Sequence, residues 1–391
     1  MIPPGVRDAL PLAPVLLFGL FLVSACRPPE PSLASADVVG VLSRPVDDRF
    51  ARALGPVDFS FPLDHGPHEE YATEWWYYTG NLTGEDGGEY GYQLTFFRSG
   101  LAPGESDRPS DFAAQQLYMA HFAVTSGPAR QHLSFDRFSR GAAGVAGASS
   151  SPEYSVWLDN WRAQQTGPGR MHLVAAAEGE DGPVSIDLTL TETRSPLLHG
   201  ENGYSRKGPE VGNANHYYSL ARMDTTGQIV FAGSQVPVSG FSWMDHEFGT
   251  SALSEDAVGW DWFAVTLDNG VVLMFAEIRT RSGPAQDIFD GTLSFPDGRQ
   301  LPIASSELEL TPTGSWTSPD TGILYPSGWR AVFPQHQIEL TIEPLIDDQE
   351  MDVAFIYYEG ATIVSGLMEG RPVSGRGYVE LTGYGAAGFR R

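Results

Sequence analysis

Apolar and polar residues alternate with a period of two along most of this 391-residue chain. Short runs of aromatic and β-branched residues are separated by Gly, Pro, Asn and Asp, which is typical of strands joined by turns. The clearest runs are residues 90–99, 116–126, 154–164, 184–193, 270–280 and 337–345. No long apolar stripe of period 3.6 predicts a helix, so the pattern indicates an all-β protein built as barrels or sandwiches.

A β-hairpin pattern occurs twice. Residues 74–98 align with residues 259–279, so that Trp75 matches Trp260, Tyr78 matches Phe263 and Arg98 matches Arg279. Each copy reads as an aromatic strand, a Gly-containing turn and a second strand that ends in arginine. The copies are too far apart for a solenoid, so they indicate a duplicated domain. We expect two domains, residues 56–240 and 241–391.

The N-terminus reads as an export signal. Residues 1–25 contain Arg7, then an apolar run, then small residues before Cys26, the only cysteine in the chain. This pattern predicts a signal peptide rather than a transmembrane helix. Small residues directly before a cysteine resemble a bacterial lipobox, so we expect lipidation of Cys26; an ordinary signal peptide with a chance cysteine is the alternative.

The segment after Cys26 is rich in Pro, Ser and Ala, and we interpret residues 26–55 as a lipid-anchored linker. Arg27 stands where an inner-membrane retention signal would have aspartate. The expected location is therefore the bacterial cell envelope, at the outer membrane facing the periplasm, with membrane contact through the anchor. The formal charge of -25 argues against nucleic acid as a partner.

Several motifs carry a resemblance to a known family. They read TEWWYYTGNL (73–82), YMAHFAV (118–124), GFSWMDHEFG (240–249), GWDWFAVTLDNG (259–270), TSPDTGILYPSGW (317–329), YYEG (357–360) and GRGYVELTGY (375–384). Together they resemble the lipocalin-like AttH/carotenoid 1,2-hydratase family, many of whose members are labelled predicted secreted hydrolases. The resemblance implies two successive lipocalin-like antiparallel β-barrels. It also implies a possible hydro-lyase activity on an apolar substrate, although Tyr358 replaces the tryptophan expected in many relatives.

Hydration of a carbon–carbon double bond needs an acid, a base for water and a lining that stabilises positive charge. Asp245, His246, Glu247 and Asp261 are the candidate catalytic residues, with Asp261 or Asp245 as proton donor and His246 as its partner. In a strand, Trp260 and Trp262 share one face and Asp261 lies on the other with Phe263. A structural ion pair between Asp261 and Arg279 is an equal alternative, and a structural role is as plausible for the Asp-His-Glu run.

The candidate ligand-binding residues are aromatic or lie in the family motifs. They are Trp75, Trp76, Tyr78, His121, Trp243, Trp260, Trp262, Arg279 and Glu359. Core packing is the more common role for any single one of them. Neighbouring residues of a strand point to opposite sides, so the Asp-His-Glu run would need His121 or His216 to bind a metal, and we expect no metal and no cofactor.

Two functions remain open at this point. The first is an envelope lipoprotein that catalyses cofactor-independent acid-base hydration or isomerisation of an isoprenoid or acyl substrate. The second is a non-enzymatic carrier of a hydrophobic small molecule, associated with an ABC-type transporter.

Overall fold

The computed structural model describes Met1 and residues 48–104, 114–250, 253–284 and 288–385. The described residues between 48 and 385 belong to one compact unit. The predicted signal peptide, Cys26 and most of the predicted linker lie outside the described residues. In the described part of that linker Phe50 and Ala53 are buried, so packing begins before residue 56. Across the described ranges, none of the helices has the length and apolar character needed to cross a membrane.

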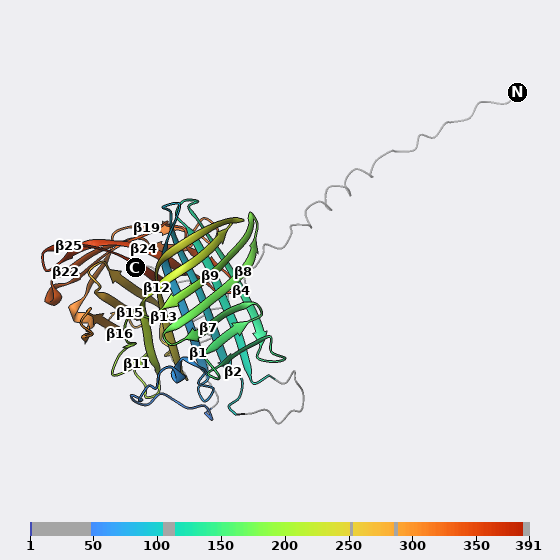
Figure 1. The fold of residues 1–391 in the computed structure, drawn as a ribbon, viewed down its shortest axis with the longest axis horizontal. Coiled ribbons are helices and arrows are strands. Elements are labelled where there is room, and N and C mark those ends of the chain that lie inside the picture. Colours follow the sequence, from blue (N-terminus) through green and yellow to red (C-terminus); the bar gives the residue numbers. More distant parts are fainter. Residues whose placement is uncertain (2–47, 105–113, 251–252, 285–287, 386–391) are drawn as a thin grey trace. The chain divides into compact units, whose positions relative to one another are not determined.

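The first half of the described chain forms a 13-stranded antiparallel sheet (Figure 1). Its main path runs β4-β3-β2-β1-β13-β12-β9-β8-β7-β6-β5, and β10 and β11 both pair with β12. The strands are β1 (Thr73–Gly84), β2 (Glu89–Gly100), β3 (Gln116–Ser126), β4 (Gln131–Arg140), β5 (Ala146–Ser149), β6 (Ser155–Leu158), β7 (Trp161–Gly167), β8 (Arg170–Gly179), β9 (Gly182–Thr191), β10 (Leu197–Leu198), β11 (Tyr204–Arg206), β12 (Ala214–Phe231) and β13 (Ser234–Gly249).

The second half forms a 10-stranded antiparallel sheet with the path β17-β16-β15-β14-β25-β24-β22-β21-β18, and β23 pairs with β24. Its strands are β14 (Ala257–Leu267), β15 (Val272–Thr280), β16 (Ile288–Ser294), β17 (Gln300–Pro302), β18 (Glu309–Pro312), β21 (Trp329–Phe333), β22 (Ile338–Pro344), β23 (Glu350–Asp352), β24 (Ile356–Met368) and β25 (Arg371–Leu381). The remaining elements are the hairpin β19 (Ser315–Thr317) and β20 (Leu324–Pro326) and the 3-10 turns η1 (Leu63–His65), η3 (Ser305–Glu307) and η4 (Pro334–His336).

The duplication seen in the sequence is present in the sheets. In the first sheet the opening strand β1 pairs with the closing strand β13, and in the second β14 pairs with β25. The hairpins β1–β2 and β14–β15 are the two repeat copies. The all-β prediction of two lipocalin-like barrels is confirmed. The change of sheet comes later than expected, because β13 runs through residue 240 to Gly249 and still belongs to the first sheet.

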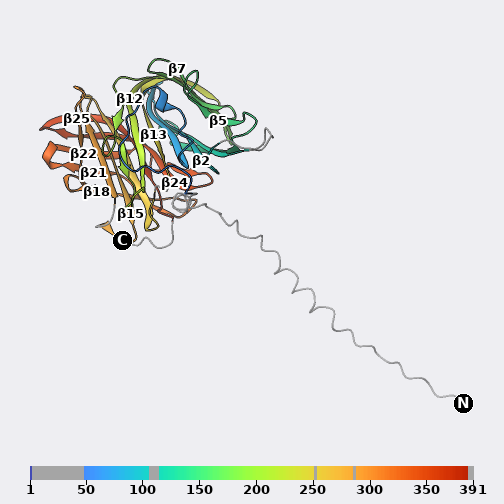
Figure 2. The same ribbon diagram turned by 90° about the horizontal axis from the view of Figure 1, so that it is seen from below.

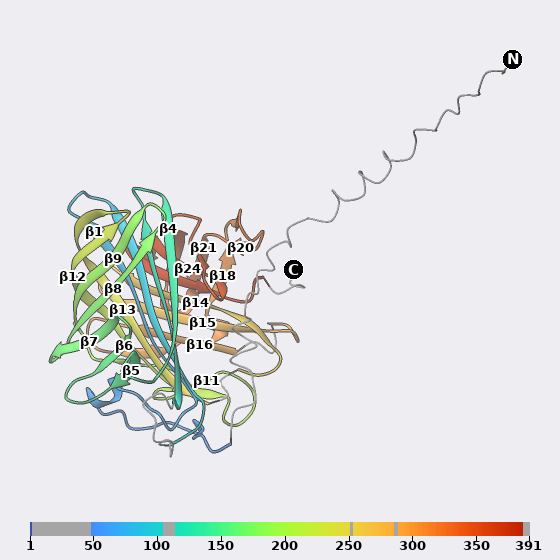
Figure 3. The ribbon, with the colours of Figure 1, turned by 90° about the vertical axis from the view of Figure 1, so that its right-hand side faces the viewer.

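Each barrel-like sheet encloses its own apolar core. Trp76, Tyr78 and Leu94 belong to the first core, and Phe263 and Trp329 belong to the second. A third buried cluster, which includes Tyr77, Tyr217 and Trp262, joins the outer faces of the two sheets. The red and orange strands of the second sheet lie beside the strands β1, β12 and β13 of the first in both Figure 1 and Figure 2. Figure 3 shows the first sheet curling around its own interior.

Candidate active site between the two barrels

The strand β13 divides the Asp-His-Glu run between two environments. Met244, His246 and Phe248 belong to the inside of the first barrel, where Met244 is part of the core. Asp245 and Glu247 face the second barrel, because successive side chains of a strand point to opposite sides. Strand geometry therefore separates the predicted acid from its predicted histidine partner.

Asp245 and Glu247 line a cavity of about 160 Å³ between the two barrels. The cavity wall combines outward-facing residues of β1, β2, β3, β12 and β13 with those of β14, β15, β24 and β25. Its aromatic lining consists of Trp75, Tyr77, Phe97, Tyr217, Trp260, Trp262, Phe355 and Tyr357. The site thus lies on the shared outer surface of two barrels rather than inside one of them.

Asp245 is held by three donors. The Tyr217 hydroxyl donates to its Oδ2 at 2.7 Å, and the Ser219 hydroxyl and the Trp243 indole N–H donate to its Oδ1. Burial nevertheless dominates and raises the pKa of Asp245 to about 7. The Trp262 indole N–H donates to the Tyr217 hydroxyl at 3.1 Å, which connects this network to the second barrel.

Two further carboxyl groups enter the cavity from the second barrel. Glu359 on β24 is fully buried, and burial together with the negative charge of Glu380 raises its pKa well above the usual range. The Tyr77 hydroxyl donates to Glu359 Oε2 at 2.8 Å, while Oε1 has no hydrogen-bond partner among the described residues. Burial also raises the pKa of Glu380 on β25 to about 7, against the opposing effect of a hydrogen bond from Trp260.

Glu247 has a different environment from these three carboxyl groups. Its Oε1 lies 2.9 Å from the Lys207 ammonium nitrogen and its Oε2 accepts a hydrogen bond of 2.6 Å from the Asn215 amide. Lys207 also lies 4.8 Å above the centre of the Tyr217 ring. Among the described residues Glu247 therefore has an ion-pair partner, which Asp245, Glu359 and Glu380 lack.

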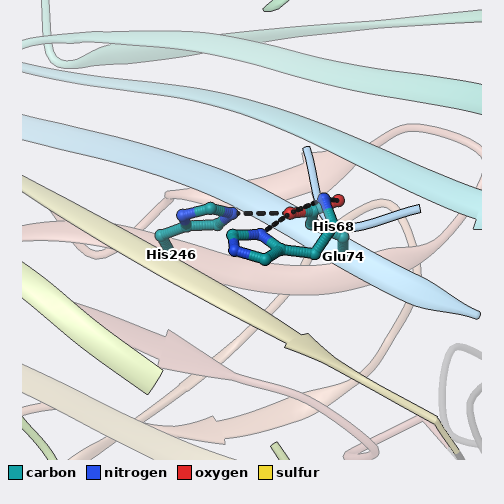
Figure 4. Close-up of side chains that lie close together, drawn as sticks. All are labelled: His68, Glu74 and His246. Carbon is teal, nitrogen blue, oxygen red and sulfur yellow. Dashed lines mark hydrogen bonds and ion pairs between the residues drawn. The ribbon is translucent and has the colours of Figure 1, made fainter. Parts of the chain in front are cut away.

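His246 lies in a buried polar cluster with Glu74 and His68 (Figure 4). Its Nε2 lies 2.8 Å from Glu74 Oε1 and its Nδ1 lies 2.9 Å from the Tyr218 hydroxyl. The Arg98 guanidinium pairs with Glu74 Oε2 at 2.8 Å. The candidate ligand atoms of His68, Glu74 and His246 lie within 4.8 Å of one another, a spacing that a metal ion could use. Hydrogen bonds and the Arg98 charge already satisfy these atoms, so the cluster serves as a structural ion network.

Asp261 lies on the face of β14 opposite Trp260 and Trp262, as the alternation predicts, and it does not line the cavity. The Arg279 Nε lies 3.2 Å from its Oδ1, and the Tyr384 hydroxyl donates to both of its oxygens at 3.0 Å. This geometry favours the structural ion pair over a role as proton donor.

The other predicted ligand-binding residues fall into two groups, those that line the cavity and those that do not. Trp75, His121, Trp260, Trp262 and Glu359 line the cavity. By contrast, Trp76 and Tyr78 fill the first barrel, where the Trp76 indole donates to the His65 carbonyl at 2.9 Å. Trp243 belongs to the buried cluster between the barrels and donates a hydrogen bond to Asp245, and Arg279 forms an ion pair with Asp261.

Most of the cavity residues were not among the predicted site residues, and these include Lys207, Tyr217, Tyr357 and Glu380. Tyr217 and Tyr357 could have been found from the alternation, since each is two residues from another outward-facing position on its strand. Lys207 follows the short strand β11 and carries no periodic signal. Its position beside Glu247 depends on tertiary packing.

The fold and the site define a lipocalin-like β protein whose two barrels enclose a cavity lined by carboxyl and aromatic groups. Residues 52–384 match the AttH-like family, and the chain belongs to this family. A solved structure of a Nitrosomonas europaea protein assigned to AttH is 32% identical, with a TM-score of 0.75, and the match covers 86% of this chain and 100% of that one.

One curated relative and one solved structure of the same fold are kievitone hydratases. The curated protein from Fusarium solani subsp. phaseoli is 22% identical over 224 residues, which are 52% of this chain and 59% of that protein. The chain therefore matches less than two thirds of its length. The crystal structure of kievitone hydratase from Nectria haematococca shares the fold, with a TM-score of 0.62, 15% identity and coverage of 85% of this chain and 98% of that one.

Proposed function

We propose that this protein is a cofactor-independent hydratase that adds water to a carbon–carbon double bond of an apolar substrate held between its barrels. The observation that carries the proposal is the Glu359 carboxyl group, which is fully buried in a largely aromatic cavity and has one oxygen without a hydrogen-bond partner in the described part of the chain. A carboxyl group whose pKa is raised by an apolar site is protonated at neutral pH and can act as a general acid.

Glu359 would deliver the proton to carbon. Because Tyr77 donates to Oε2, the acidic proton belongs on Oε1, the oxygen that no described residue contacts by a hydrogen bond. Transfer of this proton to one carbon of the double bond breaks the Glu359 O–H bond, forms a C–H bond and leaves a carbocation on the other carbon. Burial raises the pKa of Glu359, and the nearby carboxyl groups of Glu380 and Asp245 add to this effect when they are ionised, so the proton stays available before the reaction.

The aromatic wall would stabilise the cation. Trp75, Trp260 and Trp262 all line the cavity, and the face of an aromatic ring attracts a cation by about 0.5 to 2 kcal/mol, most strongly where water is excluded. Several rings around one cation can thus lower the barrier without any metal or cofactor.

Glu380 would receive the proton of the attacking water. Its pKa of about 7 places part of the population in the ionised form at neutral pH. It is half-buried, which gives water access, whereas Asp245 is buried and already accepts three hydrogen bonds. Water attack forms the C–O bond, its proton passes to Glu380, and return of one proton from Glu380 to Glu359 closes the cycle. Loss of a different substrate proton to Glu380 would instead move the double bond, which is an isomerisation.

The relatives support this reaction class. Kievitone hydratases share the fold, and the one from Fusarium solani subsp. phaseoli also shares sequence over part of its length. The substrate of the present protein is a separate question, because that relative is matched over only 59% of its length. We further propose that the chain acts in the bacterial envelope, anchored through Cys26 near the outer membrane, which the residues before Cys26 support.

The test is hydration of unsaturated terpenoids and fatty acids in water labelled with heavy oxygen, followed by mass spectrometry of the products. We expect the wild type to add one labelled water, Glu359→Gln to lose at least about a hundredfold in rate, and Glu380→Gln to lose a comparable amount. Glu343→Gln on β22 is the matched control, because Glu343 is exposed and does not line the cavity.

The outcome also separates the enzyme from the carrier. The hydratase proposal would be contradicted by a ligand that binds to wild type and to Glu359→Gln with equal affinity and is released by both without chemical change. Such a result would support a carrier of hydrophobic molecules, the function in which a transporter partner is expected.

A further inference from the structure

Within the described ranges, a second polar atom at the cavity wall has no hydrogen-bond partner. His121 on β3 lines the cavity, is 1% exposed and lies with its Nδ1 at 2.7 Å from the Tyr357 hydroxyl. Its Nε2 is buried and has no hydrogen-bond partner among the described residues. A buried polar atom without a partner costs about 1 to 3 kcal/mol, so such an atom at a cavity wall marks a place where a ligand supplies the partner.

The partner that fits is a neutral oxygen. Burial lowers the pKa of His121 to about 3, so the imidazole is neutral at physiological pH and offers no charge to an anion. A neutral imidazole presents a donor at one nitrogen and an acceptor at the other, and the Tyr357 hydroxyl can serve either form of Nδ1. A ligand hydroxyl satisfies Nε2 in both tautomers because it can donate or accept.

The surroundings of His121 place this oxygen within an otherwise apolar ligand. Phe97 contacts the imidazole edge-to-face with a centroid distance of 5.3 Å, and Phe355 lies at 6.2 Å. Tyr357 and Glu359 occupy positions two residues apart on one face of β24, which separates them by about 7 Å along the strand. The hydroxyl at His121 is thus several bonds away from the double bond that Glu359 would protonate.

We propose that His121 is a specificity-determining residue and that the substrate is an oxygenated unsaturated compound, such as a terpenoid alcohol or an alkenyl phenol, rather than a pure hydrocarbon. The position of the substrate double bond in this inference rests on the proposed hydratase function. The position of the substrate hydroxyl group rests on the cavity geometry alone. Sites built to hydrogen-bond a substrate hydroxyl discriminate strongly against the analogue that lacks it, because the buried polar group then stays unpaired.

The experiment compares two ligand pairs that differ by one hydroxyl group, namely geraniol with its deoxy hydrocarbon and 4-allylphenol with allylbenzene. Equilibrium dialysis of the purified protein, with gas chromatography of the unreacted ligand and of any hydrated product in both compartments, gives each dissociation constant. We expect the wild type to bind the hydroxylated member of at least one pair about tenfold more tightly, although the hydrocarbon is the more hydrophobic.

His121→Phe keeps a ring but removes the hydrogen bond, so we expect it to bind both members equally or to prefer the hydrocarbon. His132→Phe on β4 is the matched control, because His132 also has a buried Nε2 without a described partner but does not line the cavity; it should keep the wild-type preference. Tyr357→Phe is a second variant, which removes the hydroxyl that orients the imidazole and should weaken the preference.

Equal binding within both pairs by the wild type, or no binding of any of the four compounds, would overturn the inference, since water alone would then serve Nε2. A preference for the hydroxylated ligand that persists in His121→Phe would also overturn the inference. Failure of the hydratase proposal would give a different result: the protein would still bind the hydroxylated ligands more tightly, but it would add no water to them. Hydration of the hydrocarbons at the rate of the alcohols would support the hydratase and refute the role of His121.

Discussion

The carboxyl group of Asp245 should make the protein less stable as the pH rises, and its removal should abolish this effect. Burial raises the pKa of Asp245 from 3.8 to about 7. Between these values the folded state holds a proton that the unfolded state has released. Stability therefore falls with rising pH across the window from about pH 4 to pH 7. Three pKa units at about 1.4 kcal/mol each correspond to about 4 kcal/mol lost by pH 8.

Asp245→Asn removes this pH dependence but loses part of the hydrogen bonding. The asparagine oxygen can still accept from Ser219 and Trp243, whereas its NH₂ group replaces the oxygen that accepts from Tyr217. One lost hydrogen bond costs about 1 kcal/mol. We therefore expect the variant to be about 1 kcal/mol less stable than the wild type at pH 4 and about 3 kcal/mol more stable at pH 8, with a crossover between them.

Urea unfolding monitored by tryptophan fluorescence at intervals from pH 4 to pH 8 would measure this difference. Asp181→Asn, in the exposed turn between β8 and β9, controls for the removal of one negative charge from an acidic protein. If the difference between Asp245→Asn and the wild type were independent of pH, or grew more unfavourable toward pH 8, Asp245 would not be held protonated by burial and the reasoning would fail.

Three further predictions concern residues on and off the cavity. Lys207 is the only lysine of the chain, so a cavity ligand should slow its acetylation several-fold in peptide mass spectra, and unchanged labelling would place the ligand elsewhere. Asp261→Asn should lower the free energy of unfolding by about 3 kcal/mol, measured in urea, because it breaks a buried ion pair. It should leave the hydration rate of the folded enzyme unchanged, and a large loss of rate would restore Asp261 as a catalytic candidate. Cys26→Ser should move the protein from the membrane to the soluble envelope fraction on immunoblots, whereas an unchanged membrane fraction would exclude Cys26 as the anchor.

The sequence predicted the fold better than the site because the two depend on different information. The duplicated hairpin, the period-two pattern and the family motifs together predict two barrels, and the sheets confirm them. Local alternation also predicts correctly that Asp261 lies opposite Trp260 and Trp262. It does not tell which face of a strand points into a barrel when both faces are apolar. Trp75 and Trp76 are adjacent aromatic residues, yet one lines the cavity and the other fills the first core.

The location of the site follows from this two-sided burial. A lipocalin-like barrel in isolation would expose the outer face of its strands to water, and polar residues would alternate with apolar ones there. Here the outer faces of β1, β13 and β14 are covered by the opposite barrel, so Tyr77, Trp243 and Trp262 are as buried as core residues. The few carboxyl groups on these faces lose most of their contact with bulk water without losing their access to the cavity. Burial between two barrels, rather than a special sequence motif, gives Asp245, Glu359 and Glu380 their raised pKa values and makes this interface the place where acid chemistry can occur.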